Sequence, residues 1–239
     1  MLDVDLHAHT FFSNCGIHTH MELLHRAKEL GMKGLAITDH GPALDSRITW
    51  PFFDRLHKPV EGIRFIKGLE CNLIDAQGTI DIVQIPQRFR KYLELILVGF
   101  HPNLEKGLGA ETYTDMIITA IKRNPCIDII AHPNELDYPL DFEPLARVAK
   151  EHGVALELNN SKTLYKRTTE ECTRELVRTC KNVGCALAIG SDTHAIEELG
   201  RDESVRPYLE QESFPPSLII NDFAEKAFTF IEERKKHKG

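Results

Sequence analysis

Short apolar runs recur along the chain and alternate with longer amphipathic stretches. In the first run, apolar and polar positions alternate from Leu2 to His9, a period-2 pattern that predicts a β-strand. Further short apolar runs, which also predict strands, lie at residues 33–38, 63–69, 93–98, 127–131, 154–158 and 185–189. We therefore predict seven strands distributed over most of the chain.

Helical patterns separate these strands. The predicted helices carry an apolar stripe or a capping signal and lie at residues 19–31, 111–123, 141–152 and 168–184, and in the tail from residue 201, with a break at 215–216. Thr19 with Glu22, and Thr168 with Glu171, have the spacing of a capping box. Asp141 is the predicted N-cap of its helix. The chain thus repeats a strand, a loop and a helix.

This alternation predicts an α/β fold. Strands separated by helices favour a parallel sheet with crossover connections, and seven such units favour a closed or nearly closed barrel. The 239 residues suit one domain, so we predict a single TIM-like (β/α)7 barrel over residues 1–239. No glycine-rich dinucleotide motif follows the first strand and no P-loop occurs, which excludes the usual nucleotide-binding folds.

The amino-acid composition bears on which partners and which cellular location we expect for the protein. At 42% hydrophobic residues the chain can bury a core, and its formal charge of −7 disfavours nonspecific nucleic-acid binding. No stretch approaches the ~20 apolar residues that span a bilayer. The N-terminus lacks the pattern of a signal peptide, and the six cysteines form no C-x-x-C pair. We expect reduced thiols and a cytoplasmic location, with no membrane partner.

Residues of metal-ligating type directly follow six of the seven predicted strands. They are His7, His9, His40, Glu70, His101, His132, Asp192 and His194. In a β/α barrel the C-terminal ends of the strands meet on one face, so these side chains are expected to converge there. A four-coordinate catalytic ion keeps one position open for water and takes three protein ligands, so eight ligands exceed the needs of one or two such ions. A three-metal cluster in which Glu70 bridges two ions accounts for the number, and a two-metal cluster that leaves some histidines unligated is the alternative.

The motifs that contain these residues resemble a known family. D-L-H-A-H-T, T-D-H-G, G-L-E-x-N, G-F-H, A-H-P, E-L-N-N and G-S-D-T-H occur in the order seen in the PHP (polymerase and histidinol phosphatase) superfamily. The chain is similar, over nearly its whole length, to the stand-alone bacterial PHP phosphatases with a trinuclear zinc site. This resemblance implies a distorted (β/α)7 barrel, the eight ligands named above, and three zinc ions, with manganese or iron as alternatives.

One position departs from the family pattern. Several of those phosphatases have a further histidine ligand six residues after the second His of H-x-H, where this chain has Cys15. A thiolate binds zinc well, so Cys15 can replace that histidine directly. His18, three residues on, is a second candidate, and in a third alternative neither residue binds metal.

The resemblance also implies a reaction. A hydroxide that bridges the metals would attack a phosphate ester in line, so no Ser, Cys or His nucleophile is required. Arg167, near Lys162 and Lys166, is a candidate for binding the phosphate of a small phosphorylated substrate. A homo-oligomer is compatible with the sequence.

Other functions stay open at this point. Alternatives within the family are a phosphodiesterase or exonuclease acting on nucleotide or short oligonucleotide ends, and a histidinol-phosphate phosphatase. An amidohydrolase-type or TatD-type barrel hydrolase and a non-catalytic metal-binding module fit the ligand set less well.

Overall fold

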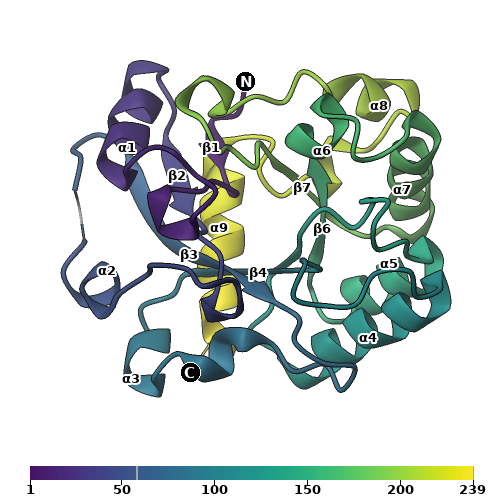
Figure 1. Cartoon of the computed structure of the whole chain (residues 1–239). Helices are drawn as coiled ribbons and strands as arrows, with labels where there is room; N and C mark the ends of the chain where they lie inside the picture. The colour runs from purple at the N-terminus through teal and green to yellow at the C-terminus, as the bar shows by residue number, and fades with distance from the viewer. Residues whose placement is uncertain (58, 239) are drawn as a thin grey trace.

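Seven parallel strands form one sheet in which the spatial order of the strands follows the sequence. The computed structural model describes residues 1–57 and 59–238. The strands are β1 (Val4–Asp5), β2 (Gly34–Ile37), β3 (Arg64–Asn72), β4 (Leu95–Gly99), β5 (Ile129–Ile130), β6 (Ala155–Asn159) and β7 (Leu187–Gly190). The prediction of seven strands in a TIM-like barrel is confirmed, although β1 and β5 are much shorter than their apolar runs (Figure 1).

Helices connect and flank the strands. They are α1 (His20–Glu29), α2 (Trp50–Asp54), α3 (Gln87–Arg90), α4 (Ala110–Arg123), α5 (Phe142–Glu151), α6 (Asn160–Leu164), α7 (Glu170–Val183), α8 (Arg206–Gln211) and α9 (Ala224–Arg234). The short helices α2, α3 and α6 were not predicted, because fewer than two turns show no clear period. None of the described helices is long and apolar enough to cross a membrane.

The predicted helix caps are confirmed at α1 and, in position, at α5, whereas the predicted cap of α7 is wrong by one residue. The Thr19 hydroxyl accepts from the backbone N–H of Glu22 at 3.2 Å, and the Glu22 carboxylate accepts from that of Thr19 at 2.8 Å. Helix α7 is capped by Thr169 rather than Thr168, since the Thr169 hydroxyl accepts from a backbone N–H three residues on. Asp141 occupies the N-cap position of α5 but makes no capping hydrogen bond with its side chain.

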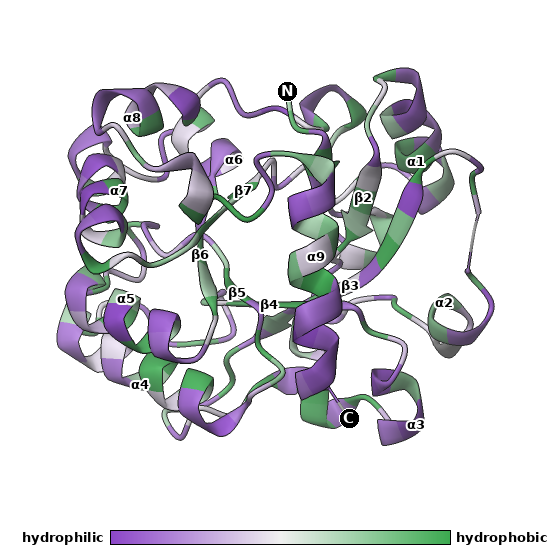
Figure 2. Ribbon diagram, turned by 180° about the vertical axis from the view of Figure 1, so that it is seen from behind, coloured by the Kyte–Doolittle hydropathy of each residue, from purple (hydrophilic) through white to green (hydrophobic). Residues whose placement is uncertain are grey.

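The two faces of the sheet pack against different helices. The outer face packs against α1, α4, α5 and α7 in the larger apolar cluster. The inner face packs against α9 through Val4, Leu6, Ala36, Ile66, Leu95, Leu97, Ile129, Ala155 and Ala188 of the sheet segment and Ala224, Ala227 and Ile231 of the helix. Figure 2 views the molecule from the side opposite to that of Figure 1 and shows α9 in front of the sheet. Because these inner residues precede the strand ends, α9 fills that part of the interior and leaves the C-terminal ends free.

The barrel is nearly closed where β1 and β7 meet. Beyond the ends of these strands, the backbone N–H of His9 donates to the carbonyl of Thr193 at 2.9 Å. Earlier along the strands, the Asn221 side chain takes the place of a backbone partner. It accepts from the N–H of Ile189 at 2.9 Å and donates to the carbonyls of Ile189 and Val4 at 2.7 and 3.1 Å. One buried amide therefore joins the first strand to the last.

Replacing Asn221 by Ala is expected to lower the free energy of unfolding by about 2–3 kcal/mol, because buried backbone groups of both strands lose their partner. Urea denaturation measures this difference. Asn182→Ala, at an exposed position on α7, is the matched control and should change stability by less than about 0.5 kcal/mol. Equal free energies of unfolding for the two variants would show that the junction between β1 and β7 does not depend on Asn221.

Candidate metal centre

The polar residues at the strand ends belong to the inner face of the sheet. Side chains of a strand alternate between its faces, so Glu70 projects to the same side as Ile66, which packs against α9. His101 and Leu97 are related in the same way. The inner face of the sheet is thus apolar where it contacts α9, and it carries metal-ligating side chains at the C-terminal ends of the strands.

Glu70 lies at the centre of this polar group, and its carboxylate is fully buried. Its Oε1 lies 3.4 Å from His7 Nε2, 3.3 Å from His101 Nε2 and 3.0 Å from His132 Nε2. Its Oε2 lies 2.8 Å from His40 Nδ1 and 3.3 Å from His9 Nε2. A single carboxylate therefore contacts imidazoles that follow four different strands.

Asp192 and His194 complete the group from the β7 side. Asp192 Oδ1 lies 3.2 Å from His9 Nε2 and 3.5 Å from His7 Nε2. The rings of His194 and His9 have centroids 4.5 Å apart. The structure thus brings together all eight residues that the strand-end pattern singled out.

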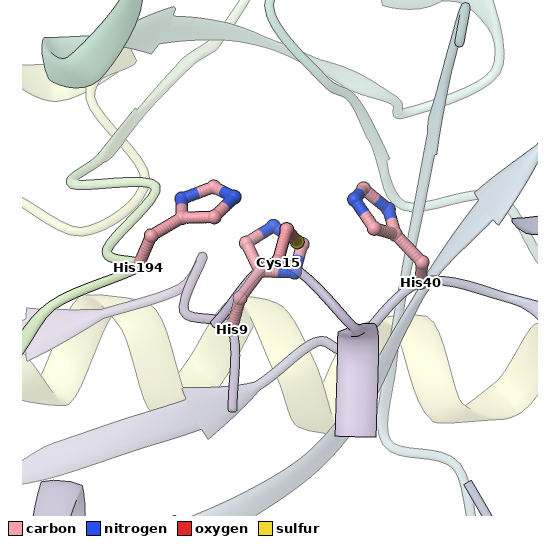
Figure 3. A group of neighbouring side chains, drawn as sticks. All are labelled: His9, Cys15, His40 and His194. Atoms are coloured by element: carbon pink, nitrogen blue, oxygen red, sulfur yellow. The ribbon is translucent and has the colours of Figure 1, made fainter. Parts of the chain in front are cut away.

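Cys15 lies with these residues, whereas His18 does not. The ligand atoms of His9, Cys15, His40 and His194 all lie within 4.8 Å of one another. Figure 3 shows the Cys15 sulfur beside the His9 ring, with His194 and His40 on either side. Among the described residues, His18 is in no such group. Partial burial raises the pKa of the Cys15 thiol, but the neighbouring imidazoles of His194 and His40 lower it to about 6.

Burial and neighbouring negative charges shift the pKa values of the histidines in opposite directions. Burial lowers the pKa of His40, but the Glu70 carboxylate raises it to about 10. Burial also lowers the pKa of His194, while Cys15 and Asp192 raise it to about 9. For His101 burial prevails, and its pKa falls to about 4. The Glu70 and Asp192 carboxylates thus favour positive charge beside them.

The donor atoms fit divalent metal ions. His7 Nε2 and His9 Nε2 face each other at 3.0 Å beside two carboxylates. His40 Nδ1 and Glu70 Oε2 are buried only 2.8 Å apart, yet neither these atoms nor the two ring nitrogens of His101 make a hydrogen bond of good geometry. Such unsatisfied donor atoms are costly unless another partner is present. Imidazole nitrogen, carboxylate oxygen and thiolate sulfur are the ligands that zinc takes in proteins.

Two supporting residues, Glu157 and Ser13, were not identified from the sequence, whereas Asp39 was a candidate either to orient a ligand or to cap the turn that follows it. Glu157 Oε1 accepts from His7 Nδ1 at 2.7 Å, and its Oε2 accepts from the backbone N–H of His132 at 2.8 Å. Ser13 Oγ lies 2.9 Å from His9 Nδ1 and donates to Asp39 Oδ1 at 2.5 Å. A single glutamate within the apolar run V-A-L-E-L-N was the available signal for Glu157. For Ser13, in a loop, no periodic signal exists.

The cluster opens into a cavity of about 710 Å³ that Cys15, Lys162 and Arg167 also line. Lys162 Nζ is 3.6 Å from Asp192 Oδ2, and its side chain is only 13% exposed. Arg167 is 64% exposed and lies 3.9 Å from Glu135. Of the two cations, Lys162 lies closer to the cluster, and Arg167 stands at the exposed edge of the cavity.

Comparisons with known proteins agree with this geometry. The PHP domain family matches residues 5–161. The chain is 36% identical to a probable phosphatase of Acetivibrio thermocellus, over 98% of this chain and 96% of that one. It is 34% identical to the probable phosphatase YcdX of Escherichia coli, again over 98% and 96% of the two chains.

Solved structures share the fold at low sequence identity. A histidinol phosphate phosphatase of Lactococcus lactis, determined with zinc, L-histidinol and phosphate, has a TM-score of 0.60 and 15% identity, over 97% of this chain and 93% of that one. A chain from archaeal ribonuclease P with mature tRNA has a TM-score of 0.64 and 19% identity, over 98% and 91%. The family match and the identities above 30% across nearly the whole chain show that this protein belongs to the PHP domain family and is a phosphoesterase of that family.

Proposed function

We propose that the protein is a metal-dependent phosphatase that hydrolyses a small phosphorylated substrate. The observation that carries this proposal is the single buried carboxylate of Glu70 within 3.4 Å of five imidazoles, at the bottom of an open cavity. Polynuclear metal sites of this kind act on phosphate esters because several cations can hold the phosphate oxygens at once.

The proposed ligands fall into three groups. The first is His7, His9 and Asp192, the second is His40, Glu70 and His101 with His132 beside them, and the third is His9, Cys15, His40 and His194. Because the groups share His9 and His40, the nine side chains would be divided among the ions. We propose three ions, and the thiolate favours zinc over manganese or iron. When bound, the ions would polarise phosphate oxygens and lower the pKa of a coordinated water toward about 7.

The chain itself orients the ligands and attracts the substrate. Glu157 accepts a hydrogen bond at His7 Nδ1, which leaves Nε2 directed at the cluster. Ser13 acts in the same way on His9 Nδ1 and is held by Asp39. The Lys162 ammonium, close to the cluster and lining the cavity, is suited to bind a phosphate oxygen. Arg167 at the edge of the cavity would meet a more distant part of the substrate.

Replacing Cys15 by Ala is expected to remove about one of the three proposed zinc ions per chain, because the third group loses its only thiolate. His18→Ala, three residues along the same loop, is the matched control and should keep the full count. Metal content measured by inductively coupled plasma mass spectrometry separates the two. A loss of zinc from the His18 variant alone would assign the loop ligand to His18.

A substrate screen tests the proposed reaction. Phosphomonoesters, including histidinol phosphate, would be compared with bis-p-nitrophenyl phosphate and with short 5′-phosphorylated oligonucleotides at equal concentration. A cavity of about 710 Å³ suits a small molecule, so monoesters are expected to show the highest kcat/KM. Preferential cleavage of the diester or removal of nucleotides from oligonucleotide ends would replace the proposal with a phosphodiesterase or exonuclease.

A further inference from the structure

A second cavity, of about 670 Å³, lies at the other end of the barrel. Ile96, near the start of β4, lines this second cavity, whereas His101, just beyond the end of β4, lines the metal cavity. The remaining walls come from the segment 82–91, the last residue of α4 and the three residues after it, and the C-terminal segment. The two cavities are therefore separate, and the second one lies on the face that holds no proposed metal ligand.

The described walls of the second cavity, called the basic cavity below, carry positively charged side chains and no carboxylate side chain. Its cationic side chains are Arg88, Arg90, Lys91, Arg123 and Lys238, and no Asp or Glu is among its described lining residues. Lys238 is already paired with buried Asp128. The other cations have no carboxylate within 4.0 Å among the described residues. In a chain with a formal charge of −7, such a concentration of unpaired cations is unusual.

The arginines of the basic cavity differ from most other arginines of the protein in having no nearby carboxylate among the described residues. Across the described part of the chain, only four arginines have no carboxylate within 4.0 Å, namely Arg47, Arg88, Arg90 and Arg123. Three of these four line the basic cavity. The others pair with acidic residues, as expected on the surface of an acidic protein.

The arginine side chains of the basic cavity are held by backbone carbonyls and an aromatic ring, which do not neutralise their charge. Arg90 donates through Nε to the carbonyl of Ile85 at 2.8 Å and through Nη2 to that of Val83 at 3.0 Å. Arg123 donates to the carbonyl of Gln77. The guanidinium carbon of Arg88 lies 4.8 Å from the centre of its neighbouring Phe ring. Guanidinium groups fixed in this way are preorganised to bind phosphate oxygens in pairs.

We propose that the basic cavity binds a small ligand that contains a chain of two or more phosphates. Several cations around one concave space match several linked phosphates better than a single one, and the volume is that of a small-molecule site. The acidity of the whole chain disfavours an extended nucleic acid as the ligand. This site is independent of the proposed phosphatase reaction, because it shares no lining residue with the metal cavity.

Two cysteines allow both cavities to be followed in one experiment, since Cys126 lines the basic cavity and Cys15 lines the metal cavity. The full chain is treated with iodoacetamide, with and without inorganic tripolyphosphate, and alkylation of each cysteine is measured by peptide mass spectrometry. At ten times its Kd, tripolyphosphate should slow alkylation of Cys126 about tenfold, because only about a tenth of the cavities stay empty. Protection should fall as NaCl is added.

Matched variants locate the binding. The double variant Arg88→Ala, Lys91→Ala should lose protection of Cys126, whereas Arg147→Ala, on the exposed surface of α5, should retain it. Thermal melting of the double variant checks that it is folded. ATP that protects Cys126 as well as tripolyphosphate does would identify the phosphate chain as the recognised group, and stronger protection by ATP would add a nucleoside to it.

Three results would overturn the proposal. The first is an unchanged alkylation rate of Cys126 at every tripolyphosphate concentration, with or without protection of Cys15. The second is equal protection of Cys126 in the double variant and the unmodified chain. The third is protection by a short single-stranded RNA but not by tripolyphosphate, which would make the cavity part of a nucleic-acid surface.

Discussion

Replacing Glu70 by Gln is expected to lower kcat/KM for p-nitrophenyl phosphate by about 10³-fold or more, equivalent to about 4 kcal/mol of transition-state stabilisation. Glutamine has nearly the same shape, but it is neutral and one of its terminal atoms cannot accept a metal. Glu70 contacts imidazoles with both oxygens, so either orientation of the amide would place a nitrogen where a ligand is needed. Bound metal should fall together with activity.

An exposed glutamate supplies the control for this change. Glu143→Gln on α5 alters one carboxylate that is 65% exposed and does not line the metal cavity, so kcat/KM should stay within about twofold of the unmodified enzyme. Circular dichroism verifies that both variants are folded. Full activity in the Glu70 variant would contradict the assignment of Glu70 as the central ligand.

Zinc is expected to raise the Tm of the metal-free protein by roughly 8–16 °C. At free zinc about 1,000 times its Kd, one site contributes about 4 kcal/mol of stability, and each kcal/mol shifts the Tm of a chain this size by about 2–4 °C. The physical source is the buried cluster around His101 and Glu70, whose ring nitrogens and carboxylate oxygen lack well-formed hydrogen bonds that metal contacts would replace. Differential scanning calorimetry of chelated protein, before and after zinc addition, measures the shift.

Asp192→Asn is the matched variant for the thermal experiment. Asp192 contacts His7 and His9, so its neutral analogue should bind zinc more weakly and show a smaller rise in Tm. A Tm that does not respond to zinc in the unmodified chain would mean that the histidine cluster is not a metal site.

The repeating pattern of the sequence predicts the barrel well because strands and helices differ in period. The apolar runs around Val4 and Ile129 were longer than the strands they form, since β1 and β5 pair over only two residues each. The role of the tail was not predictable in detail. Helix α9 packs inside the sheet rather than outside it, which depends on small inner residues such as Ala36 and Ala188 that no local pattern distinguishes.

The site was predictable to the extent that it follows strand ends. His101 and Glu70 end consecutive strands on the inner face, so the topology alone brings them together. The choice between Cys15 and His18 depends on how the first loop folds back, which spacing does not determine. The basic cavity is formed by segments distant in sequence, and its arginines are significant because no Asp or Glu is among the lining residues that the structure describes.

The most direct test of the central claim is a zinc titration of metal-free protein in which bound metal and hydrolysis of p-nitrophenyl phosphate are measured on the same samples. We expect no measurable turnover without metal, and activity that rises as more than one zinc ion binds per chain, consistent with the three ligand groups. Metal-free protein that hydrolyses the substrate as fast as the zinc-loaded protein would contradict this expectation.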